Sequence, residues 1–127
     1  SRGGKIMEKT KILVVDDSPF VAAQITELLG KENYEVVGHA LSGEQGIKMY
    51  EELKPDLVTM DIIMPGIDGI EAAVEILKKD PAARIVMLSS LCDSSVLEEV
   101  KSKGMHYLIP KPLEQDLLLA TLELAMK

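Results

Sequence analysis

The sequence predicts a doubly wound α/β domain, in which a parallel sheet of five strands is covered by helices on both faces. The first observation is a set of five short runs rich in Val, Ile and Leu. These runs lack the in-out alternation of a half-exposed sheet, as expected for strands that are buried on both faces. The second observation is that a segment of helical period follows each run. Strict alternation with short connections favours a parallel sheet.

The five predicted strands are separated by turn residues and helix caps. They cover residues 11–15, 35–38, 56–60, 84–88 and 107–109.

The first two predicted helices have clear start signals. Ser18 can cap a helix that has Pro19 at its first position, and Gly30 can end it. The second helix opens at Ser42 or Gly43 and stops near position 54, ahead of a proline.

The remaining three helices have signals of the same kind. Asp68 and Glu71 form a capping-box pattern for the third helix, which an Asp-Pro pair at 80–81 ends. The fourth helix spans about 94–103, with Gly104 as a C-terminal cap. The fifth helix follows Pro112. Its apolar face has 3.6-residue spacing and comprises Leu117, Leu118, Thr121, Leu122 and Ala125.

Length and composition limit the function classes. A chain of 127 residues with 46% hydrophobic and 28% charged residues is typical of one globular domain. We expect residues 10–127 to form it, and residues 1–9 to be an expression remnant or a disordered lead. No apolar run is long enough to span a membrane. The net charge of −7 argues against nucleic-acid binding, and the lone Cys92 favours a reducing cytoplasm.

Chemically active side chains follow four of the five strands. Asp16 and Asp17 follow the first, Asp61 the third, Ser89 the fourth and Lys111 the fifth. Ligand sites of open α/β sheets form where loops leave the carboxyl ends of the strands, so we expect these side chains to share one edge.

These residues together suit phosphoryl transfer to a carboxylate. Clustered carboxylates require a cation, and oxygen ligands with open positions favour Mg²⁺. A carboxylate can act as a nucleophile and form an acyl phosphate. A lysine and a hydroxyl can then stabilise charge on the phosphoryl oxygens. The pair Asp16 and Asp17 taken alone is better explained as a helix cap followed by a solvated loop, and Ser89 could merely cap the fourth helix.

Four stretches of the chain carry the aspartates and the lysine just described, with the residues around them. They read ILVVDDS at 12–18, KPDLVTMD at 54–61, IIMPGIDG at 62–69 and KPL at 111–113. In sequence and order these stretches resemble the receiver domain of two-component response regulators, especially regulators of the CheY type. The resemblance implies the flavodoxin-like strand order 2-1-3-4-5.

The resemblance implies a role for each matching residue. Asp61 is the expected phosphoacceptor of a histidine kinase. Asp16 and Asp17 are expected to bind Mg²⁺ together with Asp61 and the backbone carbonyl of Ile63. Lys111 is expected to pair with the phosphoryl group.

Two further expectations follow from the same resemblance, and one residue departs from it. The hydroxyl of Ser89 is expected to move to the phosphoryl group on activation, and the peptide bond after Lys111 is expected to be cis. The family usually has an aromatic residue three positions before the lysine, where this chain has Leu108. Tyr107 precedes it and should face the opposite side of the strand, so an aromatic switch residue is not assigned.

The second departure from the family pattern lies beside the phosphoacceptor. Ile63 and Leu91 occupy positions that are often polar in the family and guide the hydrolytic water. We expect the apolar side chains to shield the acyl phosphate and prolong its lifetime.

The resemblance implies a signalling switch rather than an enzyme. A sensor histidine kinase or phosphotransfer protein would phosphorylate Asp61. An output partner would then bind the face formed by the fourth helix, fifth strand and fifth helix, with a monomer or a phosphorylation-dependent dimer as the assembly. The chain could also be a receiver cut from a longer transcription factor or hybrid kinase.

Functions of other classes fit the sequence less well. An aspartyl phosphatase of the haloacid-dehalogenase type would need Asp-x-Asp-x-Thr after the first strand, where this chain has DDSPF at 16–20. A flavodoxin-like electron carrier would need a phosphate loop and stacking aromatics, but the chain has one Phe and no Trp. An unphosphorylated interaction scaffold is the third alternative, and the intact acidic pocket argues against it.

Overall fold

The computed structural model describes residues 8–30 and 33–127. Its sheet has five parallel strands in the order β2-β1-β3-β4-β5, which confirms the predicted doubly wound α/β fold and its strand order. The strands are β1 (Thr10–Val15), β2 (Tyr34–Ala40), β3 (Leu57–Asp61), β4 (Ile85–Ser89) and β5 (Tyr107–Pro110).

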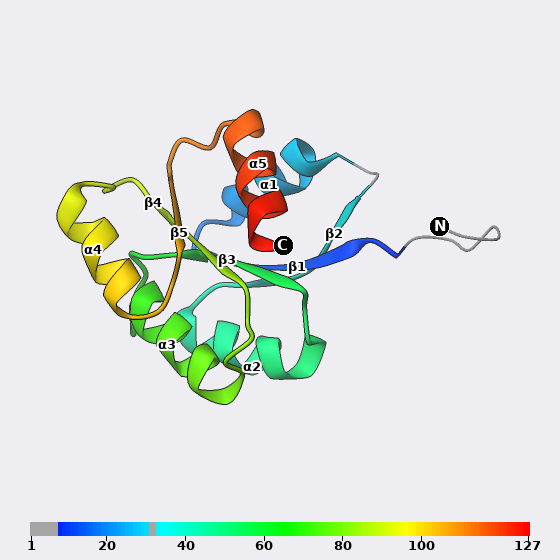
Figure 1. Cartoon of the computed structure of the whole chain (residues 1–127). Helices are drawn as coiled ribbons and strands as arrows, with labels where there is room; N and C mark the ends of the chain where they lie inside the picture. The colour runs from blue at the N-terminus through cyan, green and yellow to red at the C-terminus, as the bar shows by residue number, and fades with distance from the viewer. Residues whose placement is uncertain (1–7, 31–32) are drawn as a thin grey trace.

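A helix follows each strand, as the alternation predicts. The helices are α1 (Pro19–Leu29), α2 (Gly43–Leu53), α3 (Gly69–Lys79), α4 (Ser94–Ser102) and α5 (Gln115–Ala125). Figure 1 shows α1 and α5 on one face of the sheet and α2 and α3 on the other, with α4 beside β5.

The predicted helix caps form with the expected hydrogen bonds. The Ser18 hydroxyl accepts from the Phe20 amide at the start of α1, and Ser42 caps α2 in the same manner. Asp68 and Glu71 form the complete capping box of α3. The fourth helix is capped by Asp93, so Ser89 is not its N-cap.

Alternate residues of each strand supply two separate cores. Leu13 and Val15 pack on the side of α2 and α3, whereas Ile12 and Val14 pack on the side of α1 and α5. Because successive side chains of a strand point to opposite faces, every central strand must be apolar on both faces. This explains the unbroken apolar runs in the sequence.

The lead segment expected at residues 1–9 lies mostly outside the described residues, and that boundary stays a prediction. Within the described part, Glu8 and Lys9 are exposed and belong to no helix or strand. No helix of the described residues is long and apolar enough to cross a membrane.

Candidate functional site

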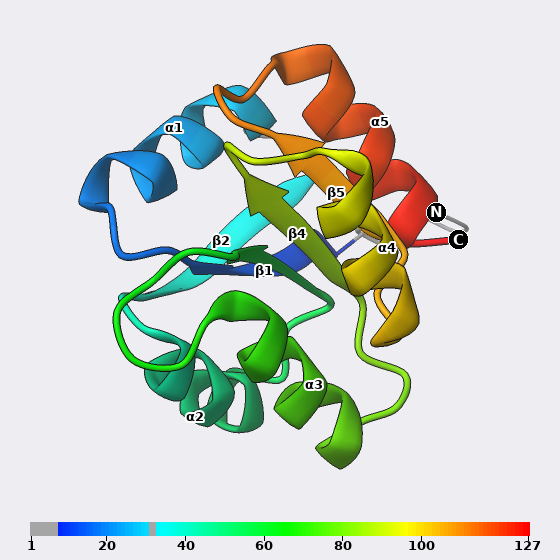
Figure 2. The ribbon, with the colours of Figure 1, turned by 90° about the vertical axis from the view of Figure 1, so that its left-hand side faces the viewer.

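The polar strand-end residues meet at one edge of the sheet because all five strands are parallel. Asp16 and Asp17 directly follow β1, and Asp61 is the last residue of β3. Ser89 ends β4, and Lys111 follows β5. Figure 2 shows the central strands β1, β3 and β4 side by side between the helix layers.

Three carboxylates and one ammonium group form the centre of the site. Oxygens of Asp16, Asp17 and Asp61 lie within 4.8 Å of one another. The Lys111 Nζ lies 2.8 Å from Asp16 Oδ2 and 3.3 Å from Asp61 Oδ1. Asp16 and Asp61 are buried, while Asp17 is exposed. We call these four residues the acid cluster.

The surroundings make ionisation of Asp61 costly. Burial raises the pKa of the Asp61 carboxyl, and the charges of Asp16 and Asp17 add to this, against the opposing effect of Lys111. Burial on its own would lower the pKa of Lys111, but its hydrogen bond to Asp16 and the nearby carboxylates more than offset this, so that pKa is raised. Lys111 is therefore charged at neutral pH.

The acid cluster fits a divalent cation by both charge and ligand type. Three carboxylates and one ammonium group leave a formal charge of −2 at one spot. All the ligand atoms offered are oxygens, which suits a hard cation such as Mg²⁺. Three side-chain ligands are fewer than the octahedral coordination of Mg²⁺ requires, so a bound ion would keep positions open for water or substrate.

Ser89 is buried and holds the loop that follows β4. Its hydroxyl oxygen accepts a hydrogen bond of 3.0 Å from the Leu91 amide, which leaves the hydroxyl proton free to be donated elsewhere. The Ser89 carbonyl accepts from the Lys111 amide at 3.0 Å. Ser89 is thereby tied to the strand end that carries the lysine.

The structure confirms two local expectations around β5. The peptide bond between Lys111 and Pro112 is cis. Tyr107 packs with the core on the α5 side, whereas Leu108 packs with the opposite core. The two side chains therefore face opposite sides of the strand, as the alternation predicts.

Four large apolar side chains are exposed in the segments that follow the first four strands. They are Phe20, Leu41, Ile63 and Leu91, of which Phe20 is 81% exposed. Leu41, Ile63 and Leu91 lie in loops between a strand and the following helix, whereas Phe20 is the second residue of α1. The side chain of Ile63 is 57% exposed, and the expectation that its backbone carbonyl binds the metal stays a prediction.

Two contributors to the site are not evident in the sequence. His39 Nε2 lies 2.9 Å from the Asp16 carbonyl oxygen, so the histidine braces the loop that carries both aspartates. Gly69 donates its amide to the Ile62 carbonyl at 2.7 Å, and a Cβ there would collide with the Asp61 carbonyl. The Asp-Gly pair at the start of α3 is the only sequence signal for this close approach.

Comparisons with known proteins identify the class of this domain. The profile of the response regulator receiver domain matches residues 12–123. The chain belongs to this family, a family of signalling domains rather than conventional enzymes.

Individual relatives match most of the chain. The chemotaxis protein CheY of Listeria monocytogenes is 39% identical over 117 residues, which cover 92% of this chain and 98% of that protein. The CheY of Bacillus subtilis is 42% identical over 109 residues, which cover 86% and 91%.

Solved structures agree on the fold. CheY in the CheX-CheY-BeF3-Mg complex of Borrelia burgdorferi has a TM-score of 0.87 at 31% identity, with 92% of this chain and 89% of that chain covered. The response regulator domain of Thermotoga maritima CheB has a TM-score of 0.86 at 34% identity, with 94% and 97% covered.

Proposed function

We propose that this chain is a phosphoacceptor switch in which Asp61 receives a phosphoryl group with the help of Mg²⁺. The observation that carries the proposal is the acid cluster, in which the Lys111 ammonium bridges Asp16 and Asp61 beside the exposed Asp17. Asp16, Asp17, Asp61 and the Ile63 carbonyl would hold the metal, which supplies positive charge to the transferring group.

The transfer step is a displacement at phosphorus. An oxygen of the Asp61 carboxylate attacks the phosphorus of a phosphohistidine on a kinase or phosphotransfer protein. The O–P bond forms while the N–P bond breaks, and the electron pair stays on the imidazole nitrogen, which takes a proton. Lys111, whose side chain is 21% exposed, can contact a phosphoryl oxygen from the side of β5.

Ser89 provides a way to transmit the modification to the surface. When the Ser89 side chain rotates to bring its hydroxyl to the phosphoryl group, the hydroxyl oxygen moves away from the Leu91 amide, which loses its acceptor. The loop between β4 and α4 must then find another arrangement. This would bias two conformations of the α4, β5 and α5 face toward the one that an output partner prefers.

The exposed apolar side chains support docking of a protein donor. Phe20, Ile63 and Leu91 are exposed in the segments that follow β1, β3 and β4, whose ends carry the acid cluster and Ser89, and a donor would cover them while transfer proceeds. We place this exchange in the cytoplasm, in accordance with the lone Cys92.

Intact mass spectrometry tests the proposal. The chain is incubated with acetyl phosphate and Mg²⁺, and we expect one added phosphoryl group. Asp61→Asn and an EDTA-treated sample serve as controls, and both should lack the adduct.

A missing adduct in the wild-type chain would contradict the small-molecule reaction. Binding of beryllofluoride with Mg²⁺ would then decide whether the pocket accepts a phosphoryl mimic. Failure of both experiments overturns the proposal and favours an unphosphorylated scaffold.

A further inference from the structure

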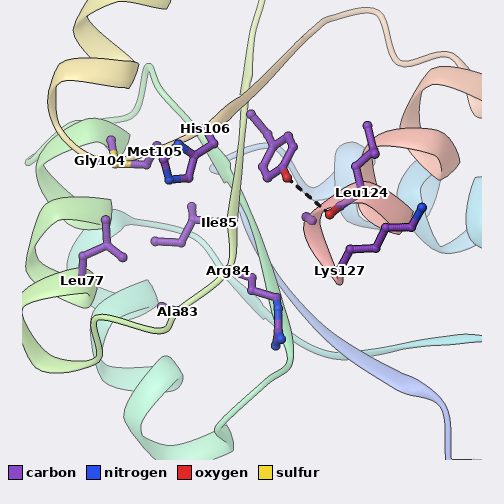
Figure 3. Close-up of a pocket in the computed structure, with 11 residues that line it drawn as sticks. Leu77, Ala83, Arg84, Ile85, Gly104, Met105, His106, Leu124 and Lys127 are labelled. Carbon is purple, nitrogen blue, oxygen red and sulfur yellow. Dashed lines mark hydrogen bonds between the residues drawn. The ribbon is translucent and has the colours of Figure 1, made fainter.

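A pocket lies at the edge of the sheet opposite the acid cluster. It has a volume of about 210 Å³ and lies where β4 and β5 begin, with Ile85 and Tyr107 among its lining residues. Figure 3 shows Leu77 and Ala83 on one side of this basal pocket and Leu124 and Lys127 on the other.

The basal pocket combines an apolar floor with a basic rim. Its rim contains Arg84, His106 and Lys127, all of them exposed, and no acidic residue lines it in the described part of the chain. This is unusual for a chain with a net charge of −7. The floor consists of Leu77, Ile85, Met105 and Ala125.

The walls of the basal pocket are fixed by contacts between elements. The Tyr107 hydroxyl donates to the Leu124 carbonyl at 3.3 Å, which ties β5 to the last turn of α5 (Figure 3). The His106 and Tyr107 rings meet edge to face with centroids 6.4 Å apart. Leu124 is itself 54% exposed and extends the apolar surface beyond the pocket.

The volume favours a single side chain as the occupant. Pockets for drug-sized ligands measure about 300–1,000 Å³, whereas an apolar cavity of about 150 Å³ can hold a benzene ring. The basal pocket lies between these sizes. Protein interfaces are commonly anchored by one aromatic or aliphatic side chain buried in such a pocket.

We propose that the basal pocket docks an acidic segment of a partner protein. The segment buries one aromatic or aliphatic side chain against the apolar floor, and its carboxylates face Arg84, His106 and Lys127. The site goes beyond the proposed phosphoryl acceptance, because it lies at the far edge of the sheet and requires no phosphoryl group.

The test is a titration of the full chain followed by amide NMR shifts. The probe is a synthetic peptide with one phenylalanine flanked by aspartates. We expect saturable shifts at Gly104, His106 and Leu124. A peptide with serine in place of phenylalanine should bind about tenfold more weakly, since the buried apolar group is lost. A peptide with lysines in place of the aspartates should also bind more weakly.

Charge reversal at the rim provides the matched comparison. The double variant Arg84→Glu/Lys127→Glu should bind the acidic peptide about three- to tenfold more weakly. The variant Lys101→Glu changes an exposed lysine that does not line the pocket and should bind as the wild type does. A smaller pocket in Ala83→Leu should also weaken binding.

Three outcomes would overturn the proposal: no saturable shifts at the pocket, equal binding of the lysine peptide, or equal weakening by Lys101→Glu. Binding of phenylacetate without binding of the peptide would assign the pocket to a small free carboxylate instead. The variant Asp61→Asn lacks the proposed phosphoacceptor and should still bind the acidic peptide. Its binding therefore tests the basal pocket independently of phosphoryl acceptance.

Discussion

Asp61 carries its charge where burial and two neighbouring carboxylates oppose it. Its pKa in the folded chain lies above its unfolded value, so the ionised form costs folding free energy at neutral pH. That cost disappears as the pH falls below the ordinary carboxyl value of about 4. We therefore expect Asp61→Asn to raise the melting temperature at pH 7 without Mg²⁺, by an amount that shrinks toward pH 4.

Thermal unfolding followed by circular dichroism checks this expectation. Glu98→Gln removes an exposed carboxylate on α4 and should leave the melting temperature unchanged. A lower melting temperature for Asp61→Asn at pH 7 would show that the ion pair with Lys111 outweighs the burial of the charge.

Thr59 is a second residue with a polar group in an unfavourable, buried environment. It is fully buried in β3 between Val14 and Val86, and its hydroxyl has no hydrogen-bond partner. Thr59→Val removes an unsatisfied polar group at nearly constant volume, so we expect a gain of about 1 kcal/mol in the free energy of unfolding.

Denaturant unfolding measures that gain. Thr121→Val is the matched comparison, because the Thr121 hydroxyl donates to the Leu117 carbonyl at 2.7 Å and its removal should bring no such gain. Destabilisation by Thr59→Val would mean that a buried water satisfies the hydroxyl.

Ile63 and Leu91 are expected to affect how long the acyl phosphate persists. Both side chains are exposed beside the acid cluster, at 57% and 58%. If they exclude the hydrolytic water, the double variant Ile63→Asn/Leu91→Asn should shorten the acyl-phosphate half-life several-fold. The decay of the phosphorylated mass measures this, with Leu124→Asn, a similarly exposed residue near the end of α5, as the control. A wild-type half-life of seconds would contradict the shielding.

At the scale of elements, Gly69 couples the start of α3 to the end of β3. Any side chain at this position would collide with the Asp61 carbonyl. Gly69→Ala should therefore displace the strand end, lower stability by about 1–3 kcal/mol and slow phosphorylation of Asp61.

Gly30 offers the comparison for that variant. It ends α1 with φ of 73°, and a Cβ there would meet no atom within 4 Å. Its ψ of −159° puts it in a backbone region that is essentially restricted to glycine, so Gly30→Ala should cost about 1–3 kcal/mol through backbone strain alone and leave phosphorylation unchanged. Equal losses of phosphorylation in both variants would refute the coupling through Gly69.

At the scale of the whole molecule, a cation should stabilise the fold through the acid cluster. A ligand that binds only the folded state adds about 2.7 kcal/mol when its concentration is 100 times its dissociation constant. We expect Mg²⁺ to raise the melting temperature of the wild-type chain. The variants Asp17→Asn and Asp61→Asn should lose most of that rise, and EDTA should reverse it.

Scanning fluorimetry with increasing Mg²⁺ makes this measurement. The variant Glu98→Gln controls for a general loss of negative charge, because it lies outside the acid cluster. An equal rise in all variants would place the metal elsewhere or show a general salt effect.

The two edges of the sheet differ in chemistry across the molecule. One edge carries the acid cluster, and the other carries the basal pocket with its basic rim. Two short strands, β4 and β5, begin at the basal pocket and end at Ser89 and beside Lys111. An NMR titration can therefore follow ligand binding at the acid cluster and at the basal pocket in the same sample.

The sequence by itself determined the order of elements, the parallel sheet and the members of the acid cluster. Hydrophobic periodicity reports burial, which is a local property of each segment, and parallel strands bring their last residues to one edge. Boundaries were less accurate. The second strand is Tyr34–Ala40 rather than 35–38, because β1 pairs with both of its ends, Thr10 with Tyr34 and Val15 with Ala40.

Only the tertiary structure decided how residues distant in sequence touch. It brings His39 to the Asp16 carbonyl, Gly69 against Asp61 and the basic rim around the basal pocket. None of these contacts follows a period along the chain, since each depends on the packing distance between two elements and on side-chain direction. The spacing of apolar residues indicates which face of a helix or strand is buried, but the packing of the elements determines which residues that face contacts.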